Sequence, residues 1–357
     1  MRLTRIVAAS ALGIAATALA AGPVLADPAA GTTPAAVDIV SVGSDTTQVV
    51  SNQISADFNA TNPASKYYSW NATDPTGSAT TITTKDGAAA IARPNGSGAG
   101  ITALQNNDHT TVDVARSSRG PAQGTDQPSD LFIAFARDAV GWSAATGGNA
   151  PSTLSVADLQ GIYGTCTITS WSQITDIAGY TGSSDAIKAY LPQTSSGTRS
   201  FFLSALHITT PGNCVQTYLP EENEGTDAVF NDPDVIYPYS IAHFVAQTYF
   251  GKSSGSDAPG FLDAFRSVKL TPTATTSFAQ VDVANQKVNT TFASTPFGRN
   301  VYNVVRSSDW NDSTLGPRLK ALLDTTGWIC TSGSADLAAN GFLTLTSAQC
   351  GTQSHTS

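Results

Sequence analysis

The sequence predicts an α/β fold, because short strands and helices alternate along most of the chain. Apolar runs such as residues 38–42 and 131–136 have the length and composition of buried strands. Stretches compatible with helices follow several of these runs and begin with hydroxyl or glycine residues. The 357 residues, of which 41% are hydrophobic, suffice for one large domain or two smaller ones.

The first part of the chain predicts a strand at 38–42 and, after the next turn, an amphipathic helix. Residues 59–92 are polar, with clusters of Asn, Thr and Ser, and predict no firm element. The first helix is expected to end near Phe58. A second helix is predicted at 98–106, and a strand at 112–116 runs on to the Gly120-Pro121 step, which ends it.

The second part begins with the continuous apolar run at 131–136, which predicts a buried strand. Residues 155–163 predict a helix, because Ser155 is a favourable N-cap and Asp158 lies in the first turn. Further strands are expected at 189–191, 236–239 and 301–305, and further helices at 198–206 and 315–323. This alternation favours parallel α/β units.

Three turns far apart in the sequence repeat one design, with glycine and hydroxyl residues where a helix is expected to start. They are Gly43–Thr47, Gly96–Gly100 and Ser195–Arg199. A helix start exposes unpaired backbone N–H groups and the positive end of the helix dipole. Glycine and Ser or Thr hydroxyls suit such a start to an oxyanion. The three turns together predict a site for a small tetrahedral anion, with simple helix capping as the alternative for each.

The N-terminal 26 residues have the pattern of an export signal. Arg2 and Arg5 precede an apolar stretch at 6–19, and small residues up to Ala26 suit cleavage. We therefore expect a secreted or extracytoplasmic protein, without a lipid anchor because no cysteine follows the apolar stretch. Residues 27–37 predict a flexible leader. No later stretch approaches the roughly 20 apolar residues of a membrane helix.

The formal net charge of −9 makes nucleic acid a poor partner. It also requires that any bound anion be held by local geometry. No cofactor motif is found. The segment Gly251–Gly255 has the literal GxSxG pattern, but it lacks the strand, elbow and helix context of a hydrolase, so we expect no enzyme.

Metal ligation is not favoured either. The four histidines form no metal spacing, and the four cysteines include no CxxC pair. Glu221, Glu222 and Glu224 beside Asn223 form a local acidic cluster, for which a solvated loop is the favoured interpretation.

With these residues in view, the chain resembles the extracellular phosphate-binding proteins of ABC importers. The similarity runs from about residue 38 to 305. Thr46 matches the family's first phosphate-contacting turn and Ser97 its second. Residues 112–119 match the strand that carries the third contact, and Ser196-Gly197-Thr198 matches the most recognisable motif. Residues 154–164, followed by Trp171, resemble a helix of the family's second lobe.

The resemblance implies a two-lobed type II periplasmic-binding-protein fold with the anion in a central cleft between the lobes. Lobe one would comprise residues 38–130 and 270–357, and lobe two residues 131–269. Binding would close the lobes by a hinge motion. The sequence allows three disulfide pairings and does not decide among them. Cys166–Cys214 with Cys330–Cys350 is favoured, because each bridge then lies within one lobe.

The chain departs from the family at its charged positions. Pro192 stands where the best-known members have an arginine, and Arg199 is a candidate replacement. Ser118 stands where they have an aspartate that accepts a hydrogen bond from protonated phosphate. Asp45 is a candidate for that acceptor, and helix capping is the equal alternative. Arg119 is the other candidate cation, whereas Arg116 alternates to the opposite strand face and ranks lower.

The expected function is a non-catalytic binding protein for inorganic phosphate or a related oxyanion. The resemblance implies an ABC permease as a partner, and we expect a monomer. The expected ligand-binding residues are Asp45, Thr46, Thr47, Ser97, Ser118, Arg119, Ser196, Gly197, Thr198 and Arg199. The alternative is a secreted surface or interaction protein that has the same fold and no retained anion binding.

Overall fold

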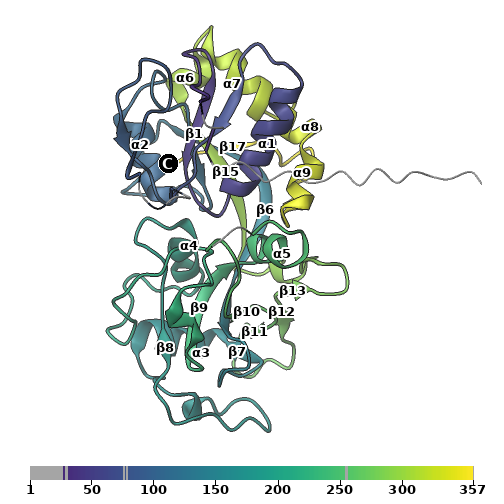
Figure 1. The fold of residues 1–357 in the computed structure, drawn as a ribbon. Coiled ribbons are helices and arrows are strands. Elements are labelled where there is room, and N and C mark those ends of the chain that lie inside the picture. The colour runs from purple at the N-terminus through teal and green to yellow at the C-terminus, as the bar shows by residue number, and fades with distance from the viewer. Residues whose placement is uncertain (1–26, 29–30, 75–76, 78, 254–255, 357) are drawn as a thin grey trace, which may run out of the picture.

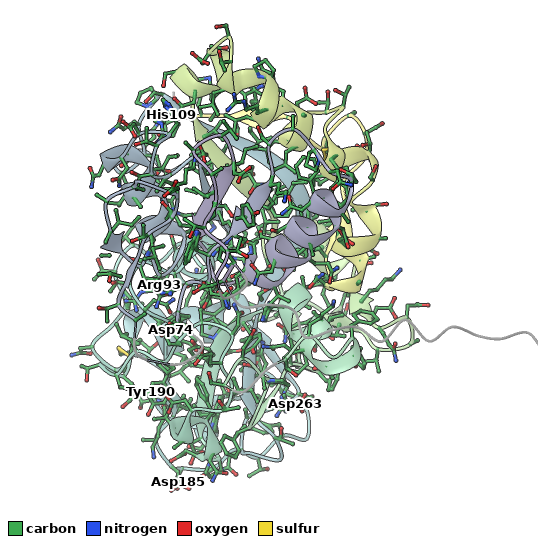
Figure 2. The ribbon with its side chains drawn as sticks, turned by 45° about the horizontal axis from the view of Figure 1, so that its top comes forward. Asp74, Arg93, His109, Asp185, Tyr190 and Asp263 are labelled. Carbon is green, nitrogen blue, oxygen red and sulfur yellow. A yellow bond between two sulfur atoms is a disulfide. The ribbon has the colours of Figure 1, made fainter. Side chains whose placement is uncertain are left out.

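The computed structural model describes residues 27–28, 31–74, 77, 79–253 and 256–356. These residues form two lobes, one above the other in Figure 1, with His109 and Asp185 near opposite ends of the molecule (Figure 2). The expected signal at 1–26 and two residues of the segment 251–255 lie outside the described residues. Among the described helices, none is long and apolar enough to cross a membrane.

Lobe one contains the first and last described strands, β1 and β17, and a sheet flanked by helices (Figure 1). Its strands are β1 (Ile39–Gly43), β2 (Tyr67–Ser69), β3 (Thr81–Ile82), β4 (Ile91–Ala92), β5 (Val114–Ser117), β16 (Leu343–Thr344) and β17 (Gln353–Ser354). Its helices are α1 (Gln48–Ala60), α2 (Ser97–Asn106), α6 (Ser307–Asn311), α7 (Leu315–Leu323), α8 (Trp328–Thr331) and α9 (Ser334–Ala339).

Lobe two contains shorter strands and the helices α4 and α5 that face lobe one (Figure 1). Its strands are β7 (Thr153–Ser155), β8 (Lys188–Ala189), β9 (Val235–Ser240), β10 (Leu262–Asp263), β11 (Ser267–Lys269), β12 (Phe278–Ala279), β13 (Val281–Asp282) and β14 (Lys287–Val288). Its α-helices are α3 (Val156–Gln160), α4 (Gly197–Ala205) and α5 (Ile241–Tyr249). The predicted capping box at Ser155 and Asp158 is present at the start of α3.

Two long strands, β6 (Asp130–Ala145) and β15 (Gly298–Arg306), connect the lobes (Figure 1). They pair antiparallel from Asp130 opposite Arg306 to Ala139 opposite Gly298. Beyond this point β6 continues into lobe two and pairs with β9. The resulting sheet has the strand order β2-β1-β5-β15-β6-β9-β8. The functional cleft is therefore expected where β6 leaves one lobe and enters the other.

The two-lobed α/β fold is confirmed, but three details differ from the sequence predictions. The sheet is mixed, because β15 and β6 run antiparallel to their neighbours, although β2, β1 and β5 are parallel. The chain returns to lobe one in β15 and not near residue 270, because β12 pairs with β11 of lobe two. Within the expected flexible leader, Asp27 forms an ion pair with Arg93.

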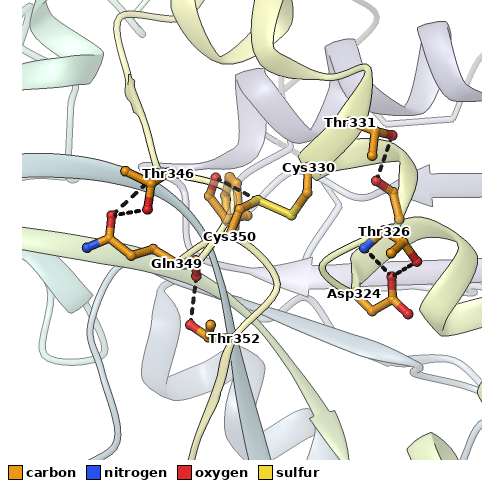
Figure 3. Close-up of a disulfide and its surroundings, with 10 residues drawn as sticks. Asp324, Thr326, Cys330, Thr331, Thr346, Gln349, Cys350 and Thr352 are labelled. Carbon is orange, nitrogen blue, oxygen red and sulfur yellow. Dashed lines mark hydrogen bonds between the residues drawn. A yellow bond between two sulfur atoms is a disulfide. The ribbon is translucent and has the colours of Figure 1, made fainter.

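Both disulfides have the favoured pairing. Cys166–Cys214 lies in lobe two, and Cys330–Cys350 ties α8 to the C-terminal segment before β17 (Figure 3). A hydrogen bond from Thr352 Oγ1 to the carbonyl of Gln349 at 2.7 Å closes the turn around Cys350 (Figure 3). On the loop-entropy account, closing loops of these lengths contributes about 3–4 kcal/mol each.

Candidate functional site

The three glycine-hydroxyl turns meet at the boundary between the lobes. A Cβ on Gly43 would lie 2.9 Å from the Cα of Gly100, so the first two turns touch through glycine. The second and third turns touch across the boundary, where the amide of Gly98 donates to the carbonyl of Ser195 at 3.0 Å. Gly96 has a φ of 96°, and its added Cβ would lie 2.5 Å from the same carbonyl oxygen. The predicted convergence of the turns is therefore present.

Hydroxyl groups from the first and third turns converge on one carboxylate, that of Glu222. Thr46 Oγ1 donates to Glu222 Oε1, and Ser196 Oγ donates to Oε2. Thr198 Oγ1 donates to Oε1 over 2.7 Å. All four side chains are buried. Because Thr46 belongs to lobe one and the other two hydroxyls to lobe two, both lobes hold the same group. These three hydroxyls are called the cradle below.

The position of Glu222 corrects the interpretation of its segment as a solvated loop. Glu222 is 2% exposed, and its neighbours also contact lobe one. Glu221 accepts two hydrogen bonds from Asn95 Nδ2, at 2.9 and 3.0 Å. A run of polar residues resembles an exposed loop in sequence, and only the tertiary structure brings hydroxyl donors to its carboxylates. The spacing of the glutamates therefore could not predict that Glu222 bonds to the hydroxyls of the turns.

One guanidinium group reaches the cradle, and it belongs to Arg299 on β15. Its Nη2 donates to Thr198 Oγ1 at 2.9 Å and to Asp138 Oδ2 at 2.8 Å. Asp138 lies opposite Arg299 on β6, so this buried ion pair joins the two connecting strands. Arg299 Nη1 is buried and has no hydrogen-bond partner among the described residues. The sequence analysis missed Arg299, because nothing in the local sequence links it to the distant turns.

A second buried cation, Arg116, lies beneath the first turn. It is completely buried and donates to the carbonyl oxygens of Ser41, Gly43 and Ser44 at 3.2, 3.4 and 3.1 Å. None of the ion pairs among the described residues includes it. Burial lowers the pKa of this guanidinium to about 10, so it is charged at neutral pH. This low-ranked residue therefore places an unpaired positive charge next to an expected anion-binding turn.

The remaining predicted hydroxyls lie beside the cradle. Ser97 Oγ and Ser118 Oγ are 3.2 Å apart, and Ser97 Oγ accepts from the amide of Ser118 at 3.0 Å. A Cβ on Gly197 would lie 2.2 and 2.3 Å from these two hydroxyl oxygens. The hydroxyl of Thr47 is buried and has no hydrogen-bond partner among the described residues. The structure thus places all four of these residues at the meeting point of the turns.

The two predicted arginines have other partners. Arg119 forms a bidentate ion pair with Asp126, with N–O distances of 2.6 and 2.8 Å. Arg199 Nη1 donates to the carbonyl of Pro192 at 2.8 Å, and its backbone amide donates to Ser196 Oγ. In the described residues, neither guanidinium bonds to the cradle. The guanidinium that does bond to the cradle is that of Arg299.

Asp45 bonds across the lobe boundary and does not cap its helix. Its Oδ1 accepts from Asn223 Nδ2 at 3.1 Å, whereas α1 begins after Thr47 without a side-chain cap. Burial raises the pKa of Asp45 well above its usual value, and the charges of Glu222 and Glu221 raise it further. Asp45 in this closed arrangement therefore favours its protonated form.

The raised pKa of Glu224, a carboxyl group near the lobe boundary, predicts that the free energy of unfolding falls as the pH rises. Burial is the main cause that raises the pKa of Glu224 from 4.5 to about 7. A carboxyl whose pKa is raised on folding holds its proton more tightly in the folded state. Its contribution is complete below pH 4.5 and is lost as the pH rises through about 7. We expect Glu224→Gln to flatten this part of the profile of unfolding free energy against pH, measured by urea unfolding. An unchanged slope in the variant would contradict the assignment.

The groups that meet at the cradle are hydrogen-bond donors to oxygen. They are the three cradle hydroxyls and the guanidinium of Arg299, and each donates to a carboxylate or hydroxyl oxygen. Among the described residues, no group of three or more His, Cys, Asp or Glu side chains is arranged to hold a metal ion. A tetrahedral oxyanion has four oxygens to accept such donors, whereas the carboxylate of Glu222 has only two.

Comparisons with known proteins agree with the two-lobed fold. Three solved structures share the fold: an ABC-type phosphate transport receptor from Vibrio cholerae, a Clostridium perfringens protein with bound phosphate, and a human phosphate-binding apolipoprotein. Their sequence identities are 17, 13 and 17%, with TM-scores of 0.53, 0.57 and 0.53. The alignments cover 86, 87 and 87% of this chain and 100, 100 and 92% of the other chains.

At these identities the solved structures establish the fold alone. Curated protein sequences gave no match. The family model of the PBP superfamily domain matches residues 28–315, which is most of the chain and includes all three turns, Glu222 and Arg299. The expected family is thereby confirmed, and the chain belongs to the PBP superfamily.

Proposed function

We propose that this protein is an exported, non-catalytic receptor that binds inorganic phosphate or a related tetrahedral oxyanion between its lobes. The observation that carries the proposal is the convergence of three hydroxyls from both lobes on the carboxylate of Glu222. This carboxylate stands in for two oxygens of an oxyanion. The fold that the chain shares with a phosphate transport receptor supports delivery to an ABC permease.

The charges around the cradle support the same ligand class. Arg299 supplies a guanidinium with one unpartnered nitrogen, and Arg116 places a buried charge under the first turn. Hydrogen bonds from charged donors to an anion are about twice as strong as neutral ones. Both groups place positive charge next to the turns, in a chain whose net charge of −9 by itself repels anions.

Calorimetric titration of the anion-free protein with phosphate, arsenate and sulfate tests the proposal. We expect saturable binding of phosphate, and a loss of about 100-fold or more in Thr198→Val. The substitution removes the hydroxyl that bonds both Glu222 and Arg299 but keeps the side-chain shape. Ser204→Ala, at an exposed position of α4, is the matched control and leaves affinity unchanged. The absence of heat with every oxyanion, in both the folded wild type and Glu222→Ala, would refute the proposal.

One observation favours a second function, an interaction protein without anion binding. In this structure, the chain's own carboxylate fills the cradle and satisfies its hydroxyls. A family member that no longer binds a ligand is expected to fill its site in this way. Titration of the wild type separates the two functions, because a cradle that Glu222 fills permanently binds no phosphate in the wild type, even if Glu222→Ala binds it.

A further inference from the structure

Residues 221–223, called the strap below, are fixed to lobe two through their backbone. The carbonyl of Glu221 accepts from the Tyr237 hydroxyl at 3.0 Å. The central amide donates to Gln193 Oε1 at 3.1 Å. The carbonyl of the last residue accepts from Tyr239 at 2.7 Å and from Gln247 at 2.8 Å. Because every strap residue has a backbone bond to lobe two, the strap moves with that lobe.

The three side chains of the strap all reach lobe one. Glu221 contacts Asn95, Glu222 contacts Thr46, and Asn223 contacts Asp45. The contacts with Thr46 and Asp45 are made between buried side chains. The strap therefore bridges the lobe boundary at three successive positions, with Glu222 in the cradle at the centre.

We infer that Glu222 is a tethered occupant of the cradle, which closes the lobes without ligand and which an incoming oxyanion displaces. The second part of this inference, displacement by an oxyanion, rests on the proposed function. Each of the three cradle hydroxyls has a single hydrogen to donate, and each donates it to Glu222. The same hydroxyls cannot hold an oxyanion at the same time, so the carboxylate and the ligand exclude each other.

The exclusion sets the sign of the effect on affinity. Bonds that exist only in the ligand-free protein stabilise that state alone and therefore weaken ligand binding. A group on a short tether acts as a competitor at an effective concentration in the millimolar range. We expect Glu222→Ala to bind phosphate about tenfold or more tightly than the wild type. Glu222→Gln keeps the shape without the charge and is expected to lie between the two.

The experiment compares wild type, Glu222→Ala, Glu222→Gln and Glu224→Gln in two measurements. Calorimetric titration with inorganic phosphate gives the affinity, and small-angle X-ray scattering without phosphate gives the separation of the lobes. Hydrogen exchange of the Gly98 amide adds a local readout, because this amide bonds to Ser195 across the boundary. Glu224 lies just beyond the strap and serves as the matched control, since no described bond joins it to lobe one.

The expected result is a more open ligand-free Glu222→Ala protein with a faster-exchanging Gly98 amide and a tighter phosphate complex. Glu224→Gln is expected to match the wild type in these three measurements. Unchanged or weaker phosphate binding in both Glu222 variants would overturn the inference and leave the proposed function intact. So would an unchanged lobe separation together with unchanged exchange. Opening of the lobes without phosphate binding in any variant would instead refute the proposed function and keep the tethered closure.

Discussion

Arg299→Met is expected to lower the free energy of unfolding by about 3–5 kcal/mol and to weaken phosphate binding by about 100-fold or more. The stability loss arises because the substitution leaves Asp138 as a buried charge without its partner; both side chains are at most 1% exposed. The binding loss arises because Arg299 is the only guanidinium that bonds to the cradle in the described residues. Urea unfolding and calorimetric titration measure the two effects separately.

A double variant distinguishes the structural role of Arg299 from its role in binding. Asp138 also accepts from Ser240 Oγ and from the amide of Ala242, each at 2.9 Å, so asparagine retains an acceptor there. We expect Arg299→Met with Asp138→Asn to recover most of the lost stability, because no buried charge is left unpaired. Phosphate binding should remain as weak as in the single variant. Recovery of affinity together with stability would show that Arg299 only positions the strands.

The parts of the site that follow from local sequence were predictable. Thr46, Ser196 and Thr198 lie at helix starts, where glycine and hydroxyl residues in a short segment specify the geometry of the backbone. Helix α7 matches its prediction over Leu315–Leu323 for the same reason, because its apolar face is encoded within nine residues. In each case the information lies within a few residues of the feature.

The charged parts of the site were not predictable, because they depend on strand pairing over long distances. Glu222 and Arg299 reach the cradle from separate segments, and their own sequences contain no signal for the meeting. Arg116 was ranked low because it alternates to the strand face opposite Ser117. All four residues of β5 are buried, so side chains on both of its faces are covered and the choice of face does not separate a site residue from a structural one.

The predicted bounds of strand β6, which supports the site, were too short. Residues 131–136 read as a complete apolar strand, but β6 continues to Ala145. Arg137 and Asp138 interrupt the apolar run where the strand leaves lobe one, and Asp138 forms a buried ion pair with Arg299. A buried pair of charges therefore concealed the longest strand of the described chain.

Gly96→Ala is expected to prevent closure and to weaken phosphate binding by about 100-fold or more. The added Cβ would lie 2.5 Å from the carbonyl oxygen of Ser195 and 2.7 Å from its carbon, which are backbone atoms of the opposite lobe. Relief requires the lobes to separate, and separation also moves Ser196 and Thr198 away from Thr46. Small-angle scattering with saturating phosphate would show the open form, and titration would show the lost affinity.

Two control variants isolate the contact from other effects of replacing glycine. Gly98→Ala lies in the same turn, but its Cβ would be 3.5 Å from the Ser195 oxygen, an ordinary contact, so closure and affinity should be retained. Gly124→Ala has a similar backbone strain, with a φ of +80°, but meets nothing within 4 Å. It should lose about 1–3 kcal/mol of stability without changing closure. If Gly96→Ala closes with phosphate as fully as these controls, the glycines do not act through contact between the turns. If it alone stays open, the shape of the site depends on glycine at the lobe boundary as well as on hydroxyls in the cradle.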